Sequence, residues 1–172
     1  MSTQLVLYLM MGLPGAGKTT VAEHISQLTG ALHISSDDIR RELFPHSTFT
    51  QSEHDQLYAE LDKRVEQALR TGHSVVYDAN LNRRQHRDEK RALAEQLTVV
   101  TKLIWVKTPE EIARERRVND QPQHDLTPTN ETPADMFDRI AQLLEPPQTD
   151  ETYVMIDGQH VSTESVSSAL GI

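Results

Sequence analysis

Eight residues near the N-terminus carry the clearest chemistry in this 172-residue chain. The segment Gly12-Leu13-Pro14-Gly15-Ala16-Gly17-Lys18-Thr19 fits the pattern G-x-x-x-x-G-K-[ST], which describes a phosphate-binding loop. Its glycines let backbone N–H groups turn toward a phosphate, and the helix that follows adds partial positive charge. Lys18 can reach the β- and γ-phosphates of a nucleotide, and the Thr19 hydroxyl can ligate Mg²⁺. We therefore expect ATP and Mg²⁺ as ligands, with the nucleotide held by the loop from Gly12 to Thr20.

The residues on either side of this loop have the order that its chemistry requires. The apolar run from Leu5 to Met11 predicts a strand, and helical spacing of Val21, Ala22, Ile25 and Leu28 predicts a helix. A glycine-rich turn with a surface lysine is the alternative interpretation. Such a turn needs neither a strand before it nor a helix after it, so the context favours phosphate binding.

Length, composition and charge limit the class of protein. A chain with 37% hydrophobic and 25% charged residues is typical of a soluble globular protein, and we expect residues 1–172 to form one domain. We find no apolar run that could span a bilayer and no signal-peptide pattern at the N-terminus, so we expect a cytoplasmic location and no membrane association. We see no partner-binding tail in the sequence and expect no obligate protein partner. Without cysteine there is neither a thiol nucleophile nor a disulfide framework. The net charge of −9 argues against broad attraction to long nucleic acid, but it allows a local basic pocket.

Strands and helices alternate along the rest of the chain. Further strands are predicted at 31–35, 74–77, 98–106 and 153–156, and helices at 36–44, 52–70, 82–96, 108–117, 132–144 and 162–170. This alternation predicts an α/β fold in which helices cover both faces of a parallel sheet. Ligands of such sheets bind at the carboxyl ends of the strands. Gly12, Asp37 and Asp78 all fall there, which predicts a single active site.

Three motifs in a fixed order extend this interpretation. The phosphate-binding loop is followed by Ser36-Asp37-Asp38-Ile39-Arg40 and by Val75-Val76-Tyr77-Asp78-Ala79-Asn80. Together they resemble the P-loop kinases of the polynucleotide-kinase-like and zeta-toxin-like group, which includes AAA-type bacterial ATP-binding kinases. The resemblance extends from Leu5 to about Leu144. It implies the P-loop NTPase fold, a three-layer αβα sandwich with a five-stranded parallel sheet in the order 2-3-1-4-5. It also implies an acceptor-side helical segment at about 45–72 and a lid segment at about 110–135.

The same resemblance implies roles for Asp37 and Arg40. In the similar kinases the first aspartate of this segment is the general base, and the arginine three residues further on contacts a phosphate of the substrate. Three residues apart at a helix start, the two side chains share one face. A carboxylate there could accept the proton of a hydroxyl whose oxygen attacks the γ-phosphate. The alternative is that Asp37 and Asp38 cap the helix and complement its dipole. The loop upstream favours the catalytic role for Asp37, and Asp38 remains a capping candidate.

Asp78 ends an apolar strand, as does the acidic residue that holds Mg²⁺ in a Walker-B element. Thr19 and Asp78 are therefore the predicted metal residues, with a strand-end turn as the alternative for Asp78. The similar kinases carry D-x-T-N at this point, whereas this chain reads Asp78-Ala79-Asn80 and lacks the threonine. Asn80 is a candidate substrate residue on this resemblance.

Arginines of the lid segment are candidates for contacting the transferring phosphoryl group. The resemblance implies that lid arginines stabilise its charge, a task that suits the fixed fork of donors on a guanidinium. Arg114 and Arg117 are three residues apart and share a helix face, so we expect at least one of them over the γ-phosphate. We expect Arg116 to point elsewhere. The alternative is a charged helix face that pairs with neighbouring glutamates.

A second group of arginines follows Asp78. Arg83, Arg87 and Arg91 recur every four residues, and this stripe could guide a phosphorylated substrate, with Arg87 as the candidate contact. A solvated face is the alternative, with the inner side of the helix formed by Ala92, Leu93 and Leu97.

These residues together predict an ATP- and Mg²⁺-dependent phosphotransferase with Lys18, Asp37, Arg114 and Arg117 in catalytic roles. One acceptor hypothesis is a 5′-hydroxyl of RNA, DNA or a nucleotide, which Asp37 and Arg40 favour. Another is the hydroxyl of a small metabolite or antibiotic, which the acidic net charge favours. A hypothesis of another class is a nucleotide-switched ATPase that acts as a binding module and does not need Asp37 as a base.

Overall fold

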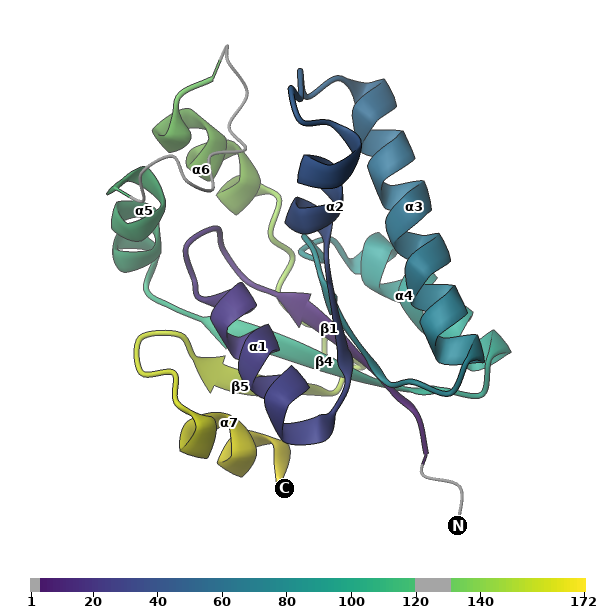
Figure 1. Ribbon diagram of the computed structural model, residues 1–172. Helices are drawn as coiled ribbons and strands as arrows, with labels where there is room; N and C mark the ends of the chain where they lie inside the picture. The colour runs from purple at the N-terminus through teal and green to yellow at the C-terminus, as the bar shows by residue number, and fades with distance from the viewer. Residues whose placement is uncertain (1–3, 120–130) are drawn as a thin grey trace.

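The computed structural model describes residues 4–119 and 131–172, and within them five strands form one parallel sheet (Figure 1). The strands are β1 (Val6–Met11), β2 (Leu32–Ser35), β3 (Val75–Asp78), β4 (Val100–Lys107) and β5 (Tyr153–Asp157). The helices are α1 (Lys18–Thr29), α2 (Ser36–Leu43), α3 (Gln51–Arg70), α4 (Arg84–Gln96), α5 (Glu110–Asn119), α6 (Pro133–Gln142) and α7 (Thr163–Leu170). The strands lie in the order β2-β3-β1-β4-β5, so the predicted fold class and strand order are confirmed. In the described part of the chain, no helix combines the length and the apolar character needed to cross a membrane.

The central strand β1 is apolar on both faces because both faces are covered. Leu7 and Leu9 pack into one core cluster together with α3 and α4. Tyr8 and Met10 point the other way and pack against α1 and α7. This alternation follows from the two-residue period of a strand, and it places the sheet between two helical layers (Figure 1).

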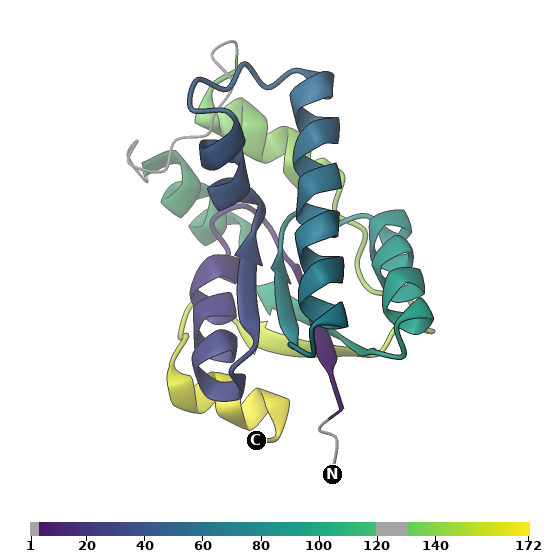
Figure 2. The same ribbon diagram turned by 45° about the vertical axis from the view of Figure 1, so that its right-hand side comes forward.

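The prediction of the long helix α3 from the spacing of its apolar residues is confirmed. Its buried residues are Leu57, Leu61, Val65, Ala68 and Leu69, which all lie on the side that packs against the sheet. Figure 2 shows α3 running beside β2 and β3, with its first turns next to α2. The N-terminal end of α3 therefore rises above the carboxyl edge of the sheet.

Helix α4 turns a different face inward than its apolar residues suggested. Arg87, Lys90 and Ala94 are buried, whereas Ala92 is exposed and Leu93 is half-buried. The stripe of Arg83, Arg87 and Arg91 was expected to face substrate or solvent, but Arg87 lies on the inner face of the helix.

Arg87 is a structural residue, and the prediction that it binds substrate is wrong. Its side chain is 0% exposed and forms a two-bond ion pair with Glu151, with Nε–Oε1 and Nη2–Oε2 distances of 2.8 Å. Its Nη1 also donates to the carbonyl oxygens of Leu81 and Asn82, at 3.1 and 2.9 Å. A buried guanidinium needs such partners, because an unpaired charge in the interior is very costly.

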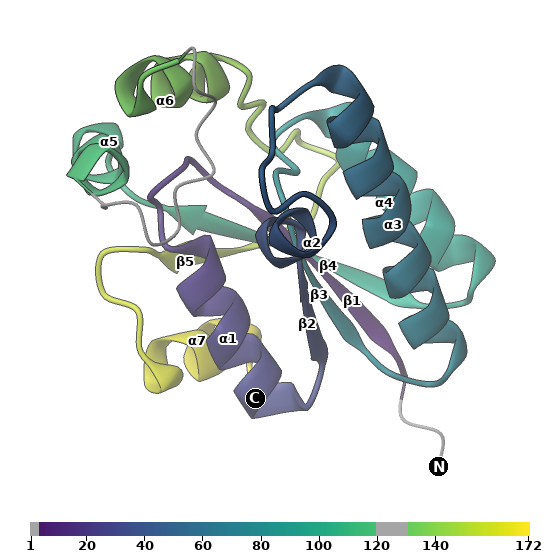
Figure 3. The ribbon, with the colours of Figure 1, turned by 45° about the horizontal axis from the view of Figure 1, so that its top comes forward.

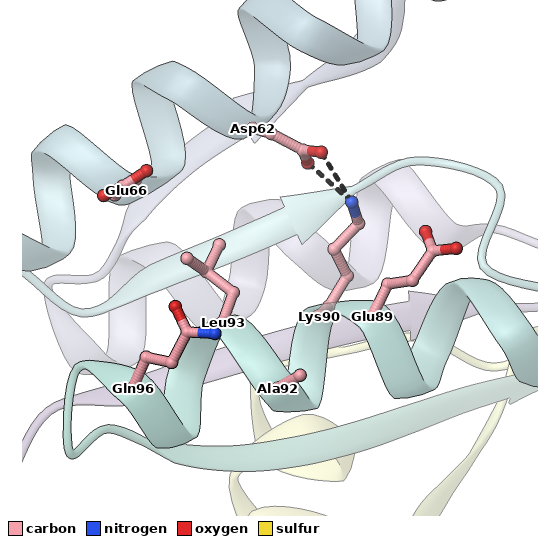
Figure 4. Close-up of a pocket in the computed structure, with 7 residues that line it drawn as sticks. All are labelled: Asp62, Glu66, Glu89, Lys90, Ala92, Leu93 and Gln96. Atoms are coloured by element: carbon pink, nitrogen blue, oxygen red, sulfur yellow. Dashed lines mark hydrogen bonds and ion pairs between the residues drawn. The ribbon is translucent and has the colours of Figure 1, made fainter.

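Lys90 ties α4 to α3 (Figure 4). Its Nζ lies 2.7 Å from both carboxylate oxygens of Asp62, and the Tyr77 hydroxyl donates to Asp62 Oδ1 at 2.8 Å. A small cavity of about 350 Å³ opens beside this group. None of the residues that line it lies at a carboxyl end of a strand, so it is separate from the candidate site described below.

The carboxyl ends of all five strands in the described chain meet at one edge, and α2, α5 and α6 stand above this edge (Figure 3). Met11 leads into the phosphate-binding loop, Ser35 leads into α2, and Asp78 ends β3. The predicted chemistry is therefore collected on one side of the molecule, as the parallel topology requires.

Candidate active site

A cleft of about 1850 Å³ opens at the carboxyl edge of the sheet. It is larger than the roughly 300–1,000 Å³ of an ordinary small-molecule pocket, so it offers room for two substrates side by side. Most of the residues predicted for the site line this cleft: Gly12, Pro14, Gly15, Gly17, Lys18, Thr19, Thr20, Asp37, Arg40, Asp78, Asn80 and Arg117. Leu13, Ala16, Arg87 and Arg114 are not among its lining residues.

Lys18 curls back over the phosphate-binding loop. Its Nζ donates to the carbonyl oxygens of Gly12 and Leu13, at 3.0 and 2.9 Å. Burial lowers the pKa of Lys18, whereas the negative charges of Asp78 and Asp37 raise it. The ammonium group of Lys18 is thus held against the loop, and the negative charges of Asp37 and Asp78 both affect its pKa.

Asn82 clamps the start of the loop, and this residue was not predicted from the sequence. Its Oδ1 accepts from the backbone N–H of Gly12 at 2.9 Å, and its Nδ2 donates to the Gly12 carbonyl at 3.0 Å. The side chain is 2% exposed. Thr108 makes a similar contact further on, because its hydroxyl donates to the carbonyl of Ala16 at 2.8 Å. Neither Asn82 nor Thr108 belongs to a periodic pattern in the sequence, and their hydrogen-bond partners, Gly12 and Ala16, are distant in sequence.

Helix α5 lies directly against the loop. Gly15 has a φ of 76°, and a Cβ at this position would lie 2.2 Å from the carbonyl oxygen of Ala113. A glycine is therefore required for both the backbone conformation and the close approach. The contact brings Arg117 to the cleft near Lys18, where its positive charge contributes to lowering the pKa of that lysine.

The other two arginines of α5, Arg114 and Arg116, do not lie where they were expected from the sequence. Arg114 pairs with Asp138 of α6, with an Nε–Oδ1 distance of 3.1 Å, and both side chains are largely exposed. Arg116 lines the cleft, and its Nη1 donates to the Gly158 carbonyl at 2.9 Å. Arg114 does not reach the cleft because it pairs with Asp138, so the expectation that at least one of Arg114 and Arg117 lies over the γ-phosphate now depends on Arg117. The expectation that Arg116 points elsewhere is not supported. Part of the expected lid, residues 120–130, lies outside the described residues.

Thr19 and Asp78 form a pair of oxygen ligands that suits Mg²⁺. The Thr19 hydroxyl donates to Asp78 Oδ2 at 2.9 Å, and His33 Nε2 lies 2.8 Å from the same oxygen. This contact raises the pKa of His33, which was not predicted as a site residue. Mg²⁺ binds through one or two protein oxygens together with phosphates and water. The pair fits that pattern, and the described residues include no cluster of three or more His, Asp or Glu that could hold a metal alone.

Asp37 lies at the start of α2 and is not the residue that caps it. The N-cap is Ser35, whose hydroxyl accepts from the backbone N–H of Asp38. Asp37 is exposed inside the cleft, where the surrounding protein displaces bulk water and raises its pKa, and Asp78 raises it further. Arg41, Lys18 and Arg40 act in the opposite direction. A carboxylate with a raised pKa beside a phosphate-binding loop is suited to accepting a proton.

Arg40 holds a donor without a partner at the acceptor side of the cleft. Its guanidinium carbon lies 4.8 Å from the centre of the Phe49 ring. Among buried side-chain nitrogen and oxygen atoms of the described residues, Nη1 of Arg40 lacks a hydrogen-bond partner. A buried donor without a partner is rare in native proteins, and such a group is usually satisfied by a ligand, an ion or a water molecule. Asn80 is exposed and lines the cleft, as its candidate role requires.

Comparison with sequence families agrees with this geometry. The family model described as AAA domain matches residues 7–147. Uncharacterized proteins of Mycobacterium tuberculosis (strain ATCC 25618 / H37Rv) and Mycobacterium bovis are each 32% identical over 100 residues, which cover 51% of this chain. The chain spans about a fifth of the length of these curated relatives, since the match covers 20% of each.

Solved structures of P-loop kinases share the whole fold. A sugar kinase from Janibacter sp. HTCC2649 superposes with a TM-score of 0.69 at 18% identity, covering 98% of this chain and 94% of its own. A gluconokinase from Sinorhizobium meliloti 1021 gives 0.67 at 19%, covering 99% and 91%. The APS kinase CysC of Mycobacterium tuberculosis, solved with AMPPNP and APS, gives 0.55 at 16%, covering 81% and 97%. At these identities the likeness demonstrates the fold, and it confirms the resemblance to P-loop kinases at that level.

Proposed function

The chain belongs to the AAA domain family, and we propose that it is a kinase that transfers the γ-phosphate of ATP to a hydroxyl group of a small molecule. One observation carries this proposal. A phosphate-binding lysine, an oxygen pair that suits Mg²⁺ and a carboxylate with a raised pKa line the same cleft. The negative charges of Asp78 and Asp37 raise the pKa of Lys18, and Asp78 also raises the pKa of Asp37, which supports a shared role for these three cleft residues.

Each of these groups has a defined part in the proposed reaction. Asp37 accepts the proton of the acceptor hydroxyl as its oxygen forms a bond to the γ-phosphorus. The bond from that phosphorus to the β–γ bridging oxygen breaks, and ADP leaves with the electron pair. Lys18 and Arg117 offset the negative charge of the phosphates, a form of electrostatic stabilisation. Mg²⁺, held by Thr19 and Asp78 when bound, supplies further charge neutralisation.

A small-molecule acceptor is favoured over a nucleic-acid end. The sugar kinase, the gluconokinase and the APS kinase that share the fold act, by their names, on small molecules. The net charge of −9 also disfavours a polyanion. The second candidate is a 5′-hydroxyl of a polynucleotide, which Arg40 favours because its guanidinium lines the cleft and could bind a phosphate.

Transfer of label from γ-labelled ATP tests the proposal. Wild type and Asp37→Asn are incubated with Mg²⁺ and with small alcohols, sugars, antibiotics, nucleosides or 5′-hydroxyl oligonucleotides. Asp38→Asn is the matched control, because Asp38 is the neighbouring carboxylate and pairs with Arg41 at 2.7 Å. We expect label on a small acceptor, loss of transfer by about 10²-fold or more in Asp37→Asn, and little change in Asp38→Asn.

Two outcomes would contradict this assignment. Label confined to oligonucleotides, with binding that weakens steeply as salt rises, would replace the small acceptor by a polynucleotide. If ATP binds but no acceptor is labelled, and slow hydrolysis is equal in wild type and Asp37→Asn, Asp37 is not the base. A nucleotide-switched binding module would then be the better explanation.

A further inference from the structure

Helix α6 presents an apolar stripe to the cleft. Met136, Ile140 and Leu143 recur at spacings of four and three residues, so they share one face of the helix, and all three line the cleft. Phe137 points away from this face and is 0% exposed, which anchors α6. Leu143 is 40% exposed. Arg139 also lines the cleft, but its guanidinium forms two bonds of 2.8 and 2.9 Å with Glu131. The apolar stripe of Met136, Ile140 and Leu143 is thus flanked by an ion pair whose charges compensate each other.

The opposite wall of the cleft, formed by α2, the loop after it and the start of α3, carries aromatic rings and the guanidinium of Arg40 beside the carboxylates of Asp37 and Asp38. Figures 1 and 3 show α2 and α3 on one side above the sheet and α6 on the other. The rings of His54 and Tyr58 contact each other in a tilted arrangement with centres 4.6 Å apart, and both line the cleft together with Phe49. Arg40 lies over the Phe49 ring and carries the unpaired Nη1. This wall therefore combines ring surfaces with a hydrogen-bond donor of positive charge.

The backbone holds Phe49 in place at an energetic cost. Its φ is 55°, a left-handed conformation that a bulky side chain rarely adopts. The carboxylate of Glu53 fixes this turn by accepting from the Ser47 hydroxyl and from the backbone N–H groups of Thr48 and Phe49, at 2.6 to 3.0 Å. These bonds lower the pKa of Glu53 to about 2, so the carboxylate stays charged at neutral pH. Backbone strain of this kind persists where the surroundings enforce it, often at ligand sites.

We propose that the acceptor is an aromatic alcohol with an anionic substituent, whose ring lies between the apolar stripe of α6 and the aromatic wall. This inference rests on the proposed kinase function and names its substrate class. A polyhydroxylated acceptor would leave hydroxyl groups facing Met136, Ile140 and Leu143, where they find no hydrogen-bond partner. A ring can pack against such apolar and aromatic surfaces, its anionic substituent can pair with the Arg40 guanidinium, and its hydroxyl can face Asp37, because all of these residues line one cleft.

Three probes that each carry a primary hydroxyl and an anionic group test the inference: 3-(hydroxymethyl)benzoate, uridine 3′-monophosphate and D-gluconate. The measurement is kcat/KM for transfer of label from ATP. We expect at least one ring-bearing probe to exceed gluconate by about tenfold or more, the ratio expected when a buried apolar face replaces exposed hydroxyls. The two ring-bearing probes distinguish a simple arene from a nucleobase as the source of the ring.

Two leucines of similar exposure, Leu143 and Leu32, provide a matched pair of variants. Leu143→Gln alters the stripe, whereas Leu32→Gln alters an edge strand outside the cleft, where Leu32 is 43% exposed. We expect Leu143→Gln to raise the KM of the ring-bearing acceptor about tenfold and to leave the KM of ATP unchanged. Leu32→Gln should change neither constant.

The possible results separate this inference from the proposed function. Preference for gluconate or another ring-free acceptor, or equal behaviour of the two leucine variants, overturns the aromatic acceptor. Transfer that still depends on Asp37 would then leave the kinase function in place. Absence of transfer to every acceptor overturns both.

Discussion

Replacing Asn82 by alanine should loosen the phosphate-binding loop more than any substitution of an exposed neighbour. The amide of Asn82 makes two hydrogen bonds to the backbone of Gly12, at 2.9 and 3.0 Å, in a region where both residues are buried. Asn82→Ala removes both bonds and leaves the Gly12 N–H without a partner, whereas the Gly12 carbonyl keeps the hydrogen bond from Lys18 Nζ. A buried polar group without a partner costs about 1–3 kcal/mol and a lost hydrogen bond about 0.5–1.5 kcal/mol, so we expect a loss of about 2–4 kcal/mol in the free energy of unfolding. A typical domain has about 5–15 kcal/mol, so the variant should still fold.

Asn80→Ala is the matched control. Asn80 is exposed, and its Oδ1 accepts one hydrogen bond, from the Asn82 N–H at 3.2 Å. Its removal should cost less than about 1 kcal/mol. Urea denaturation gives both free energies, and amide hydrogen exchange at Gly12 reports the clamp itself. Calorimetric titration should show ATP binding that is weaker by about tenfold or more in Asn82→Ala, since about 1.4 kcal/mol of loop ordering corresponds to tenfold in affinity.

The clamp would be refuted if Asn82→Ala lowered the free energy of unfolding by no more than Asn80→Ala does. It would also be refuted if the Gly12 amide exchanged equally slowly in Asn82→Ala and in the wild type. Either result would mean that the loop keeps its conformation without the Asn82 side chain.

Three further predictions concern the buried ion pair, the packing of the loop and the pH dependence. Glu151→Gln should lower the free energy of unfolding by about 3–5 kcal/mol, because it leaves the Arg87 guanidinium uncompensated, and urea denaturation should show a smaller loss when both residues become apolar. Gly158→Ala should weaken ATP binding, because the added Cβ would lie 2.0 Å from the Ala16 carbonyl oxygen; an unchanged affinity by calorimetry would exclude this packing. The acid limb of kcat/KM should lie above the ordinary Asp pKa of about 3.9, because the raised pKa of Asp37 means that its deprotonated, active form is lost at a higher pH as the solution is acidified. A pH–rate profile with its limb at or below that ordinary value would argue against Asp37 as the base.

Much of the fold could be predicted because its signals are local. Apolar runs mark the strands, and the spacing of Leu57, Leu61 and Val65 marks the longest helix. The strand order came from the resemblance to P-loop kinases and is confirmed by the sheet. Local patterns do not contain that order, because it depends on which strands meet across the sheet.

The phosphate-binding loop and the position of Asp78 were also readable from the sequence. The loop is one continuous segment, and Asp78 ends a strand that runs parallel to β1. Parallel strands bring their carboxyl ends to the same edge, so the contact between Thr19 and Asp78 follows from topology. The roles of these residues, and those of Asp37 and Arg40, remain proposals for the experiments above.

The sequence by itself thus determined the phosphate-binding loop, the alternation of strands and helices and the edge at which the site lies. Tertiary structure decided which arginines reach that site. Arg87 turns inward because Glu151, 64 residues away, compensates its charge, and Arg114 turns outward because Asp138 of α6 attracts it. Asn82 and His33 belong to the site because they form hydrogen bonds with partners 70 and 45 residues away. Helical spacing determines which residues share a face, but the face that turns toward the cleft depends on partners brought together only by the folded chain.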